Sequence, residues 1–192
     1  KCVDSLLNCS YLNKEIILVD DGSSDNTKKI INNYAKKYDN VFSFSKENEG
    51  LGKTRNYGIE KSSGDYITFI DSDDYIDVEG YELMINLLEK DQSDVVYCGF
   101  RYVYEDKIRT DIFNCKNYYN NINEFLKYVF STSKKYCGIS ACTGVYKTSI
   151  VKKIDSPFFS EKEFLSEDKL FNYRYLKCVE SVSVIHNEFY NY

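Results

Sequence analysis

The stretch Phe69-Ile70-Asp71-Ser72-Asp73-Asp74 places three carboxylates directly after an apolar run. Further upstream, Val19-Asp20-Asp21-Gly22-Ser23 places two carboxylates directly after another apolar run. Each stretch has the composition of a buried β-strand that ends in aspartates. In open α/β sheets, ligands bind at the carboxyl ends of the strands. Carboxylates crowded at that edge repel one another unless a cation or hydrogen-bond donors compensate. The two stretches therefore predict an α/β fold that binds a divalent metal and a nucleotide.

The rest of the chain alternates between strand and helix patterns. Strands are expected at 15–19, 41–45, 65–70 and 94–99, and helices after a cap at Ser24, at 51–61 and at 78–89. This alternation predicts a mainly parallel sheet flanked by helices. After residue 100 the pattern predicts a small antiparallel element, with a hairpin (100–104 with 108–113), a helix at 122–133, a strand at 144–147, a helix capped by Ser166 and a strand at 181–186.

Composition excludes several classes of protein. The 192 residues are 43% hydrophobic and 29% charged, which indicates one globular domain, and the net charge of −5 argues against a nucleic-acid partner. The seven cysteines are irregularly spaced without a C-x-x-C motif, so free thiols in a reducing cytoplasm are expected. Lysine pairs at 36–37, 134–135 and 152–153 indicate solvated helix faces, with contact to anionic lipid headgroups as the alternative.

The second acidic stretch has the chemistry of a hard-metal site. Mg²⁺ and Mn²⁺ take oxygen ligands, usually one or two carboxylates together with substrate phosphates. An Asp-x-Asp element after a strand can direct one carboxylate to the metal and another to a ribose hydroxyl. The structural alternative is an acidic turn in which Ser72 and Asp74 cap the next helix.

The first acidic stretch suits a nucleoside. Asp20 or Asp21 can accept hydrogen bonds from a base N–H or from ribose, and Gly22 permits close approach of the ligand. The alternative is a strand-to-helix turn in which these residues only cap.

Residues 47–56 imitate a phosphate-binding loop through Gly50-Leu51-Gly52-Lys53-Thr54, but Glu47 occupies the position of the first required glycine. We instead expect Lys53 and Arg55 on a helix at the rim of the nucleotide pocket, where an arginine can stack on a base. An ion pair with a nearby aspartate is the alternative for Arg55.

Ser166-Glu167-Asp168 marks the start of a helix, where carboxylates are stabilised by the helix dipole. Either they only cap the helix, or one of them is a general base within reach of an acceptor hydroxyl. The single histidine, His186, lies in an alternating strand pattern and is expected to be structural, with a metal or phosphate contact as the alternative.

The ordered set EIILVDDGSSDNT, NEGLGKTRNYGI, GDYITFIDSDDYI and FLSEDKLFNYRYL resembles the inverting glycosyltransferases of family 2, which have the GT-A fold. The resemblance implies that Asp21, together with Asp20, contacts the base and that Arg55 lines the same pocket. It further implies that Asp71 and Asp73 form the Asp-x-Asp element, with Asp73 the better metal ligand, and that Asp168 is the catalytic base.

The reaction that this resemblance implies is transfer of a sugar from a nucleotide sugar, most simply a UDP-sugar, to an acceptor hydroxyl with Mn²⁺ or Mg²⁺ as cofactor. The expected acceptor is a saccharide or a lipid-linked saccharide in cell-surface polysaccharide or glycolipid synthesis. A cytoplasmic location follows, with peripheral contact at the inner membrane face left open, as is the oligomeric state.

The resemblance also implies a single domain over 1–192, with a nucleotide-sugar half at 1–100 and an acceptor and catalytic-base half at 101–192. Relatives open on a strand, whereas this chain begins with the helical spacing of Val3, Leu6 and Leu7. We therefore expect a first strand to be missing from the sheet, and weak nucleotide binding in consequence.

Two other functions compete with this interpretation. A sugar-phosphate nucleotidyltransferase would need a basic, glycine-rich loop near the first strand. A catalytically silent nucleotide-sugar-binding domain would not need Asp73 and Asp168, which are both present.

Overall fold

The computed structural model describes residues 1–105, 107–131, 139–158 and 167–192. Its helices are α1 (Cys2–Asn8), α2 (Thr27–Lys37), α3 (Leu51–Lys61), α4 (Gly80–Asp91), α5 (Ile122–Ser131), the 3-10 helix η1 (Ala141–Thr143), α6 (Thr148–Val151) and α7 (Glu167–Leu176). Its strands are β1 (Ile16–Asp21), β2 (Val41–Lys46), β3 (Tyr66–Ile67), β4 (Tyr75–Ile76), β5 (Val95–Val103), β6 (Ile108–Asp111), β7 (Tyr118–Tyr119), β8 (Gly144–Lys147) and β9 (Val182–Asn191).

The described strands form two sheets. β1 and β2 pair in parallel as a two-stranded sheet, while the larger sheet has the order β3-β8-β5-β9-β4, with β6 added to β5 and β7 added to β9. Only β1–β2 and β5–β9 are parallel among the described pairings, and the other five are antiparallel. The expected mainly parallel sheet is therefore wrong, although the α/β class is confirmed. The difference arises mainly at β8, which lies between β3 and β5 and is antiparallel to both.

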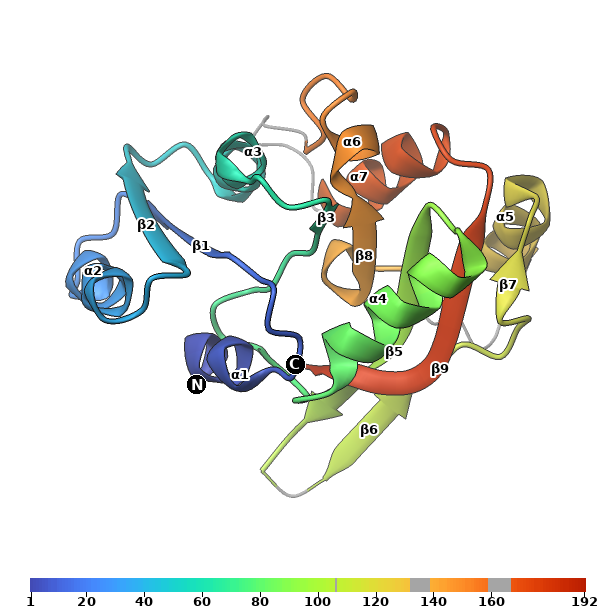
Figure 1. Cartoon of the computed structure of the whole chain (residues 1–192), viewed down its shortest axis with the longest axis horizontal. Helices are drawn as coiled ribbons and strands as arrows, with labels where there is room; N and C mark the ends of the chain where they lie inside the picture. The colour runs from blue at the N-terminus through green and yellow to red at the C-terminus, as the bar shows by residue number, and fades with distance from the viewer. Residues whose placement is uncertain (106, 132–138, 159–166) are drawn as a thin grey trace.

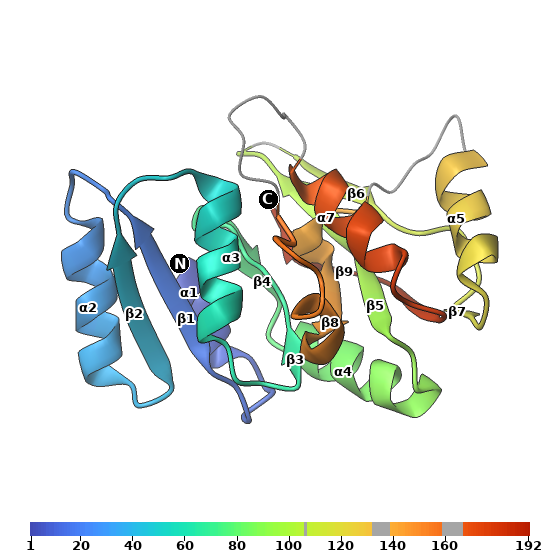
Figure 2. The ribbon, with the colours of Figure 1, turned by 90° about the horizontal axis from the view of Figure 1, so that it is seen from above.

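β5 lies inside the larger sheet and is covered on both faces. Val95 and Tyr97 belong to the core that contains side chains of α5 and α7, whereas Val96 and Cys98 pack with α4 and Phe189. Figure 2 shows α7 and α4 on opposite sides of β5, and α3 beside β1. Burial on both faces explains why this strand is a continuous apolar run without alternation.

Several expected elements have the predicted bounds. The helix at 51–61, the strand at 144–147 and the hairpin of β5 with β6 are confirmed. β3 is shorter than expected because its ladder with β8 ends at Ile67, and the Thr68 hydroxyl instead donates to the Gly144 carbonyl at 2.8 Å. The cap at Ser24 is wrong, since Asn26 occupies the N-cap of α2. Ser166 and residues 132–133 lie outside the described residues.

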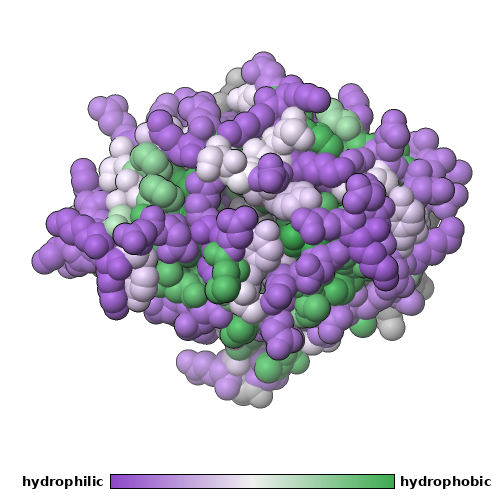
Figure 3. Space-filling model, in the orientation of Figure 1, coloured by the Kyte–Doolittle hydropathy of each residue, from purple (hydrophilic) through white to green (hydrophobic). Residues whose placement is uncertain are grey.

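The two sheets lie side by side, with β1, β2 and α2 at one end of the molecule and the larger sheet at the other (Figure 1). No ladder joins the two sheets among the described strands. The face seen in Figure 3 is mostly hydrophilic, and its apolar residues occur in small separate groups. In the described part of the chain, no helix is long and apolar enough to cross a membrane.

Candidate functional site

Arg55 of α3 is the centre of a cluster of carboxylates. Its side chain is 7% exposed, and its Nη2 lies 2.7 Å from Oδ1 of Asp71. Nη1 lies 2.5 Å from Oδ1 of Asp168 and 3.2 Å from Oε1 of Glu167. Burial alone lowers the pKa of the guanidinium, but the charges of Asp168 and Asp71 outweigh this effect and raise it. The ion pair considered as the alternative for Arg55 is thus present, and it joins the second acidic stretch to the start of α7.

Two residues of the second half also hold Asp168. Its Oδ2 accepts a hydrogen bond from the Ser140 hydroxyl at 2.7 Å, just before η1. Its backbone carbonyl accepts from the Asn172 amide at 3.0 Å, one turn later in α7. A carboxylate offers about four lone-pair positions, so these contacts leave room for a further proton donor. Asp168 is therefore oriented while it can still accept a proton.

The turn at 71–74 is closed by Tyr190 of β9. The Tyr190 hydroxyl donates to Asp74 at 2.6 Å and accepts from the backbone N–H of Asp71 at 3.1 Å. Burial raises the pKa of Asp74, the Tyr190 hydrogen bond lowers it, and the charges of Asp73 and Asp71 raise it further. Asp74 is thus a buried part of the turn. The helix-capping alternative is wrong, because β4 follows the turn and α4 begins only at Gly80.

Asp73 is exposed on the same turn, and within the described ranges its carboxylate has no hydrogen bond or ion pair. Both carboxylate oxygens of Asp71 already have neighbours, Arg55 at 2.7 Å and the Cys142 thiol at 3.6 Å. The described residues contain no group of three or more metal-ligating side chains. This donor set fits Mg²⁺ or Mn²⁺ bound by one or two carboxylates and completed by substrate phosphates, and it does not fit a cage made of protein alone.

The carboxylates that end β1 are held by the protein itself. Asp20 is buried and accepts from the Ser23 backbone N–H at 3.1 Å. Asp21 accepts from Lys46 at 2.5 Å and from the backbone N–H groups of Glu49 and Gly50 at 3.0 and 2.8 Å. Burial raises the pKa of Asp21, but the Lys46 hydrogen bond and these N–H groups lower it to about 2. Asp21 therefore joins the end of β1 to the segment that leads into α3.

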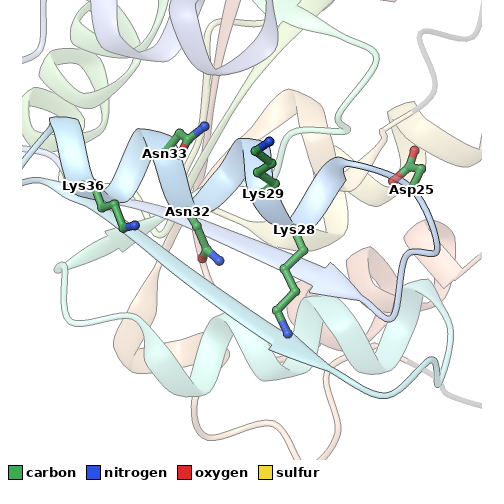
Figure 4. A pocket seen from close by; sticks show the side chains of 6 residues that line it. All are labelled: Asp25, Lys28, Lys29, Asn32, Asn33 and Lys36. Atoms are coloured by element: carbon green, nitrogen blue, oxygen red, sulfur yellow. The ribbon is translucent and has the colours of Figure 1, made fainter.

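Two surface hollows in the described part of the chain lie away from the carboxylate cluster. One of about 740 Å³ lies between α3 and residues 152–157, and Lys53 lines it, paired with Glu49 at 3.0 Å. The other, about 460 Å³, runs along α2 and is lined by Asp25, Lys28, Lys29, Asn32, Asn33 and Lys36 (Figure 4). Neither includes Asp71, Asp73 or Asp168, so the carboxylate cluster is the better candidate site. Lys53 is brought next to Glu49 and not to this cluster.

The sequence analysis missed Ser140, Cys142 and Tyr190. Cys142 is buried, and its thiol lies between Asp71 and Arg55; burial and the charge of Asp71 raise its pKa, so it stays protonated. No spacing pattern distinguishes these three residues from ordinary core residues. The Nδ1 atom of His186 donates a hydrogen bond to the Phe113 carbonyl oxygen, 2.7 Å away, as a structural histidine would.

An α/β fold with aspartates at the end of β1 and in the turn after β3 is typical of domains that bind a nucleotide, and here Arg55 joins the second of these groups to Asp168. A protein-family model described as glycosyl transferase family 2 matches residues 1–155. This chain therefore belongs to glycosyl transferase family 2.

Individual proteins agree with the family. EpsH of Bacillus subtilis, which is named as a glycosyltransferase, is 34% identical over 195 residues; these cover 100% of this chain and 55% of EpsH. Poly(ribitol-phosphate) beta-glucosyltransferase of Bacillus spizizenii is 41% identical over 99 residues, 50% of this chain and 16% of that protein. The crystal structure of S. aureus TarS 1–349 in complex with UDP-GlcNAc has a TM-score of 0.80 at 24% identity, covering 100% of this chain and 53% of that one. The expected GT-A fold is confirmed. The chain spans about half the length of EpsH and of TarS 1–349.

Proposed function

We propose that this chain is the part of a metal-dependent, inverting glycosyltransferase that transfers a sugar from a UDP-sugar to the hydroxyl of a saccharide or lipid-linked acceptor. One observation carries the proposal: Arg55 brings Asp71, at the end of a strand, next to Asp168, at the start of α7. Sugar transfer needs the donor sugar and the acceptor hydroxyl side by side, so the residues that bind the donor and the catalytic base must be neighbours. The UDP-GlcNAc complex of TarS and the glucosyltransferase name of the B. spizizenii relative support the donor and acceptor classes.

The residues have distinct roles in a single displacement. The acceptor oxygen attacks the anomeric carbon, its proton passes to Asp168, and the bond to the diphosphate oxygen breaks. Arg55 and Ser140 hold the two oxygens of Asp168, which orients the carboxylate before the acceptor arrives. Glu167 shares Arg55 and adds charge beside the base. Attack from the face opposite the leaving group inverts the anomeric configuration without a covalent enzyme intermediate.

The donor is assigned to the half formed by residues 1–100, and the acceptor and base to residues 101–192. Asp20, Asp21 and Lys53 lie on the donor side, and Asp73, with Asp71 beside it, would hold the divalent cation against the diphosphate. When bound, the cation would supply positive charge to the leaving diphosphate.

A thermal-shift screen of UDP, GDP, TDP and CDP, each with and without Mn²⁺, tests the donor site. We expect the melting temperature to rise for UDP only when Mn²⁺ is present, because binding to the folded state stabilises it. In Asp73→Asn, the metal-dependent part of the shift should disappear, while Asp39→Asn, which removes the same charge from an exposed turn, should leave it unchanged. A metal-independent shift in the wild type would contradict the metal assignment.

The catalytic base is tested by Asp168→Asn beside Glu167→Gln. Asp168→Asn should lower the rate of transfer by about 100-fold or more while UDP-GlcNAc still binds, because only the base is lost. Glu167→Gln removes a carboxylate from the same arginine and should keep most of the rate. If both variants lose the same fraction of the transfer rate, the loss reflects the disturbed ion pairs of Arg55 and not the removal of a catalytic base. A wild type that binds the donor but shows no transfer would indicate a silent binding domain.

A further inference from the structure

Three tyrosines form a row that starts beside the candidate base. Tyr192 lies near Ser140, whose hydroxyl donates to Asp168. Its ring centroid is 5.1 Å from that of Tyr190, the residue that bonds to the Asp71 backbone. The Tyr192 ring is near-parallel to that of Tyr102, with centroids 5.4 Å apart, and Tyr102 is near-parallel to Tyr104 at 6.4 Å. We call Tyr192, Tyr102 and Tyr104 the tyrosine row. It leads from the site onto the β5–β6 hairpin, which projects from the larger sheet next to the C-terminus in Figure 1.

The row is accessible to a ligand at its outer end. Tyr104 is 50% exposed, and Tyr102 and Tyr192 are half-buried. Near-parallel rings at these centroid distances are offset and overlap only in part, so each ring keeps some of its face uncovered. Exposed cations lie over two of the rings: Lys107 Nζ is 5.3 Å from the Tyr104 ring centroid and Arg109 Cζ is 5.4 Å from that of Tyr102. Long, solvated side chains of this kind can move aside at little cost.

We propose that the tyrosine row binds successive pyranose rings of the saccharide acceptor and directs its terminal hydroxyl to Asp168. This inference rests on the proposed function and extends it by placing the acceptor. Tyrosine combines a flat apolar face, which packs on the C–H face of a sugar, with a hydroxyl that hydrogen-bonds to sugar hydroxyls. The bordering Lys107 and Arg109 add donors for sugar oxygens. The row also begins where the acceptor must deliver its proton, which a row that merely stabilised the hairpin would not need to do.

The test is a titration with two hexasaccharides, cellohexaose and chitohexaose, followed by nuclear magnetic resonance on the complete chain without donor. We expect at least one of them to bind, and Tyr104→Ala to raise its Kd about fivefold, because one aromatic contact is lost. Tyr104→Phe retains the ring and should bind nearly as the wild type does. The matched control is Tyr173→Ala, since Tyr173 is 55% exposed and lies under Lys177 at 5.4 Å, just as Tyr104 lies under Lys107.

Two results would overturn the proposal: neither hexasaccharide binds the wild type, or Tyr104→Ala and Tyr173→Ala change the Kd equally. The titration needs no nucleotide, so it is independent of the donor screen. If UDP fails to bind but Tyr104 still determines saccharide affinity, the proposed function is wrong while the saccharide site stands. If UDP binds and Tyr104→Ala leaves the saccharide Kd unchanged, only the assignment of the acceptor to the tyrosine row is wrong.

Discussion

Arg55 is a single buried cation shared by Asp71, Glu167 and Asp168. A guanidinium suits this position because its planar fork presents several N–H donors in fixed directions, whereas a lysine ammonium is a point charge. Its partners come from the turn after β3 and from the first turn of α7, so one side chain of α3 contacts segments up to 113 residues away in the chain. Arg55 is therefore both the link between the two halves and the group that orients the base.

Replacing Arg55 should lower the free energy of unfolding, and the loss should be larger when the new side chain carries no charge. We expect Arg55→Met to lower the free energy of unfolding by about 2–4 kcal/mol, because three carboxylates then face one another without a cation. Arg55→Lys should lose less, since the charge is kept. Urea denaturation at pH 7 measures both. Arg109→Met is the control: Arg109 is 65% exposed in its pair with Asp111, and such pairs contribute under about 1 kcal/mol. If Arg55→Met and Arg109→Met lower the free energy of unfolding equally, the ion pairs of Arg55 contribute no more than an exposed ion pair does.

The lowered pKa of Asp21 predicts that the free energy of unfolding depends on pH. Its pKa is lowered from the ordinary 3.8 to about 2, so the folded state favours the ionised form. The resulting stabilisation is present above pH 4 and is lost as the pH falls towards 2. We expect wild type to exceed Asp21→Asn by about 1–2 kcal/mol at pH 6, with the difference shrinking between pH 4 and 3. Denaturation at several pH values checks this, with Asp39→Asn for comparison. A difference that stays constant down to pH 3 would contradict the assignment.

At the scale of elements, two glycines in helices show how packing decides the effect of one substitution. A Cβ added to Gly58 in α3 would lie 3.8 Å from Val19, which is ordinary contact. One added to Gly80, at the start of α4, would lie 2.8 Å from Cβ of Phe189 on β9. The first site has room for a methyl group, and the second does not.

The same change to alanine should therefore have opposite signs. Gly58→Ala should stabilise the protein by about 0.5–1 kcal/mol, because alanine is the better helix former. Gly80→Ala should destabilise it by about 1–3 kcal/mol, because α4 must move away from β9. Thermal denaturation of the two variants measures both effects. If both raise the melting temperature, the close packing of α4 on β9 is wrong.

At the scale of the whole molecule, the two sheets differ in how much of their apolar surface is buried. α2 has no buried residue, and β1 with β2 forms only a two-stranded sheet. β5 and β9 lie inside the larger sheet, with Val95, Tyr97, Val182 and Val184 fully buried. Regions with few buried apolar contacts open at lower free energy than the core.

Hydrogen exchange should resolve this difference. We expect the amides of residues 16–46 to exchange well before those of β5 and β9, as measured by mass spectrometry of peptides after deuteration. UDP with Mn²⁺ should slow exchange at the end of β1 if the donor site is correctly placed. Uniform protection across both sheets would contradict the picture of a separate, less stable layer.

Local patterns in the sequence were sufficient for much of the fold. α3 and β8 have the bounds that periodicity predicts, because helix and strand spacing depends on neighbours in the chain. The acidic run after an apolar strand identified Asp71 and Asp73 as candidates, the acidic start of a helix identified Asp168, and the ordered motifs identified the family. The mainly parallel pairing predicted for the sheet is wrong, because parallel and antiparallel strands have the same alternation and differ only in how the chain returns.

The sequence by itself thus determined the elements, the family and the aspartates from which the site is built. Only the tertiary structure decided what those residues contact: that Arg55 pairs with both Asp71 and Asp168, that Tyr190 closes the turn at Asp74, and that Tyr192 packs beside Tyr190. The physical reason is that hydrogen bonds, ion pairs and ring contacts form between side chains that are distant in sequence, and no local spacing encodes which of them meet once the sheets and helices have packed.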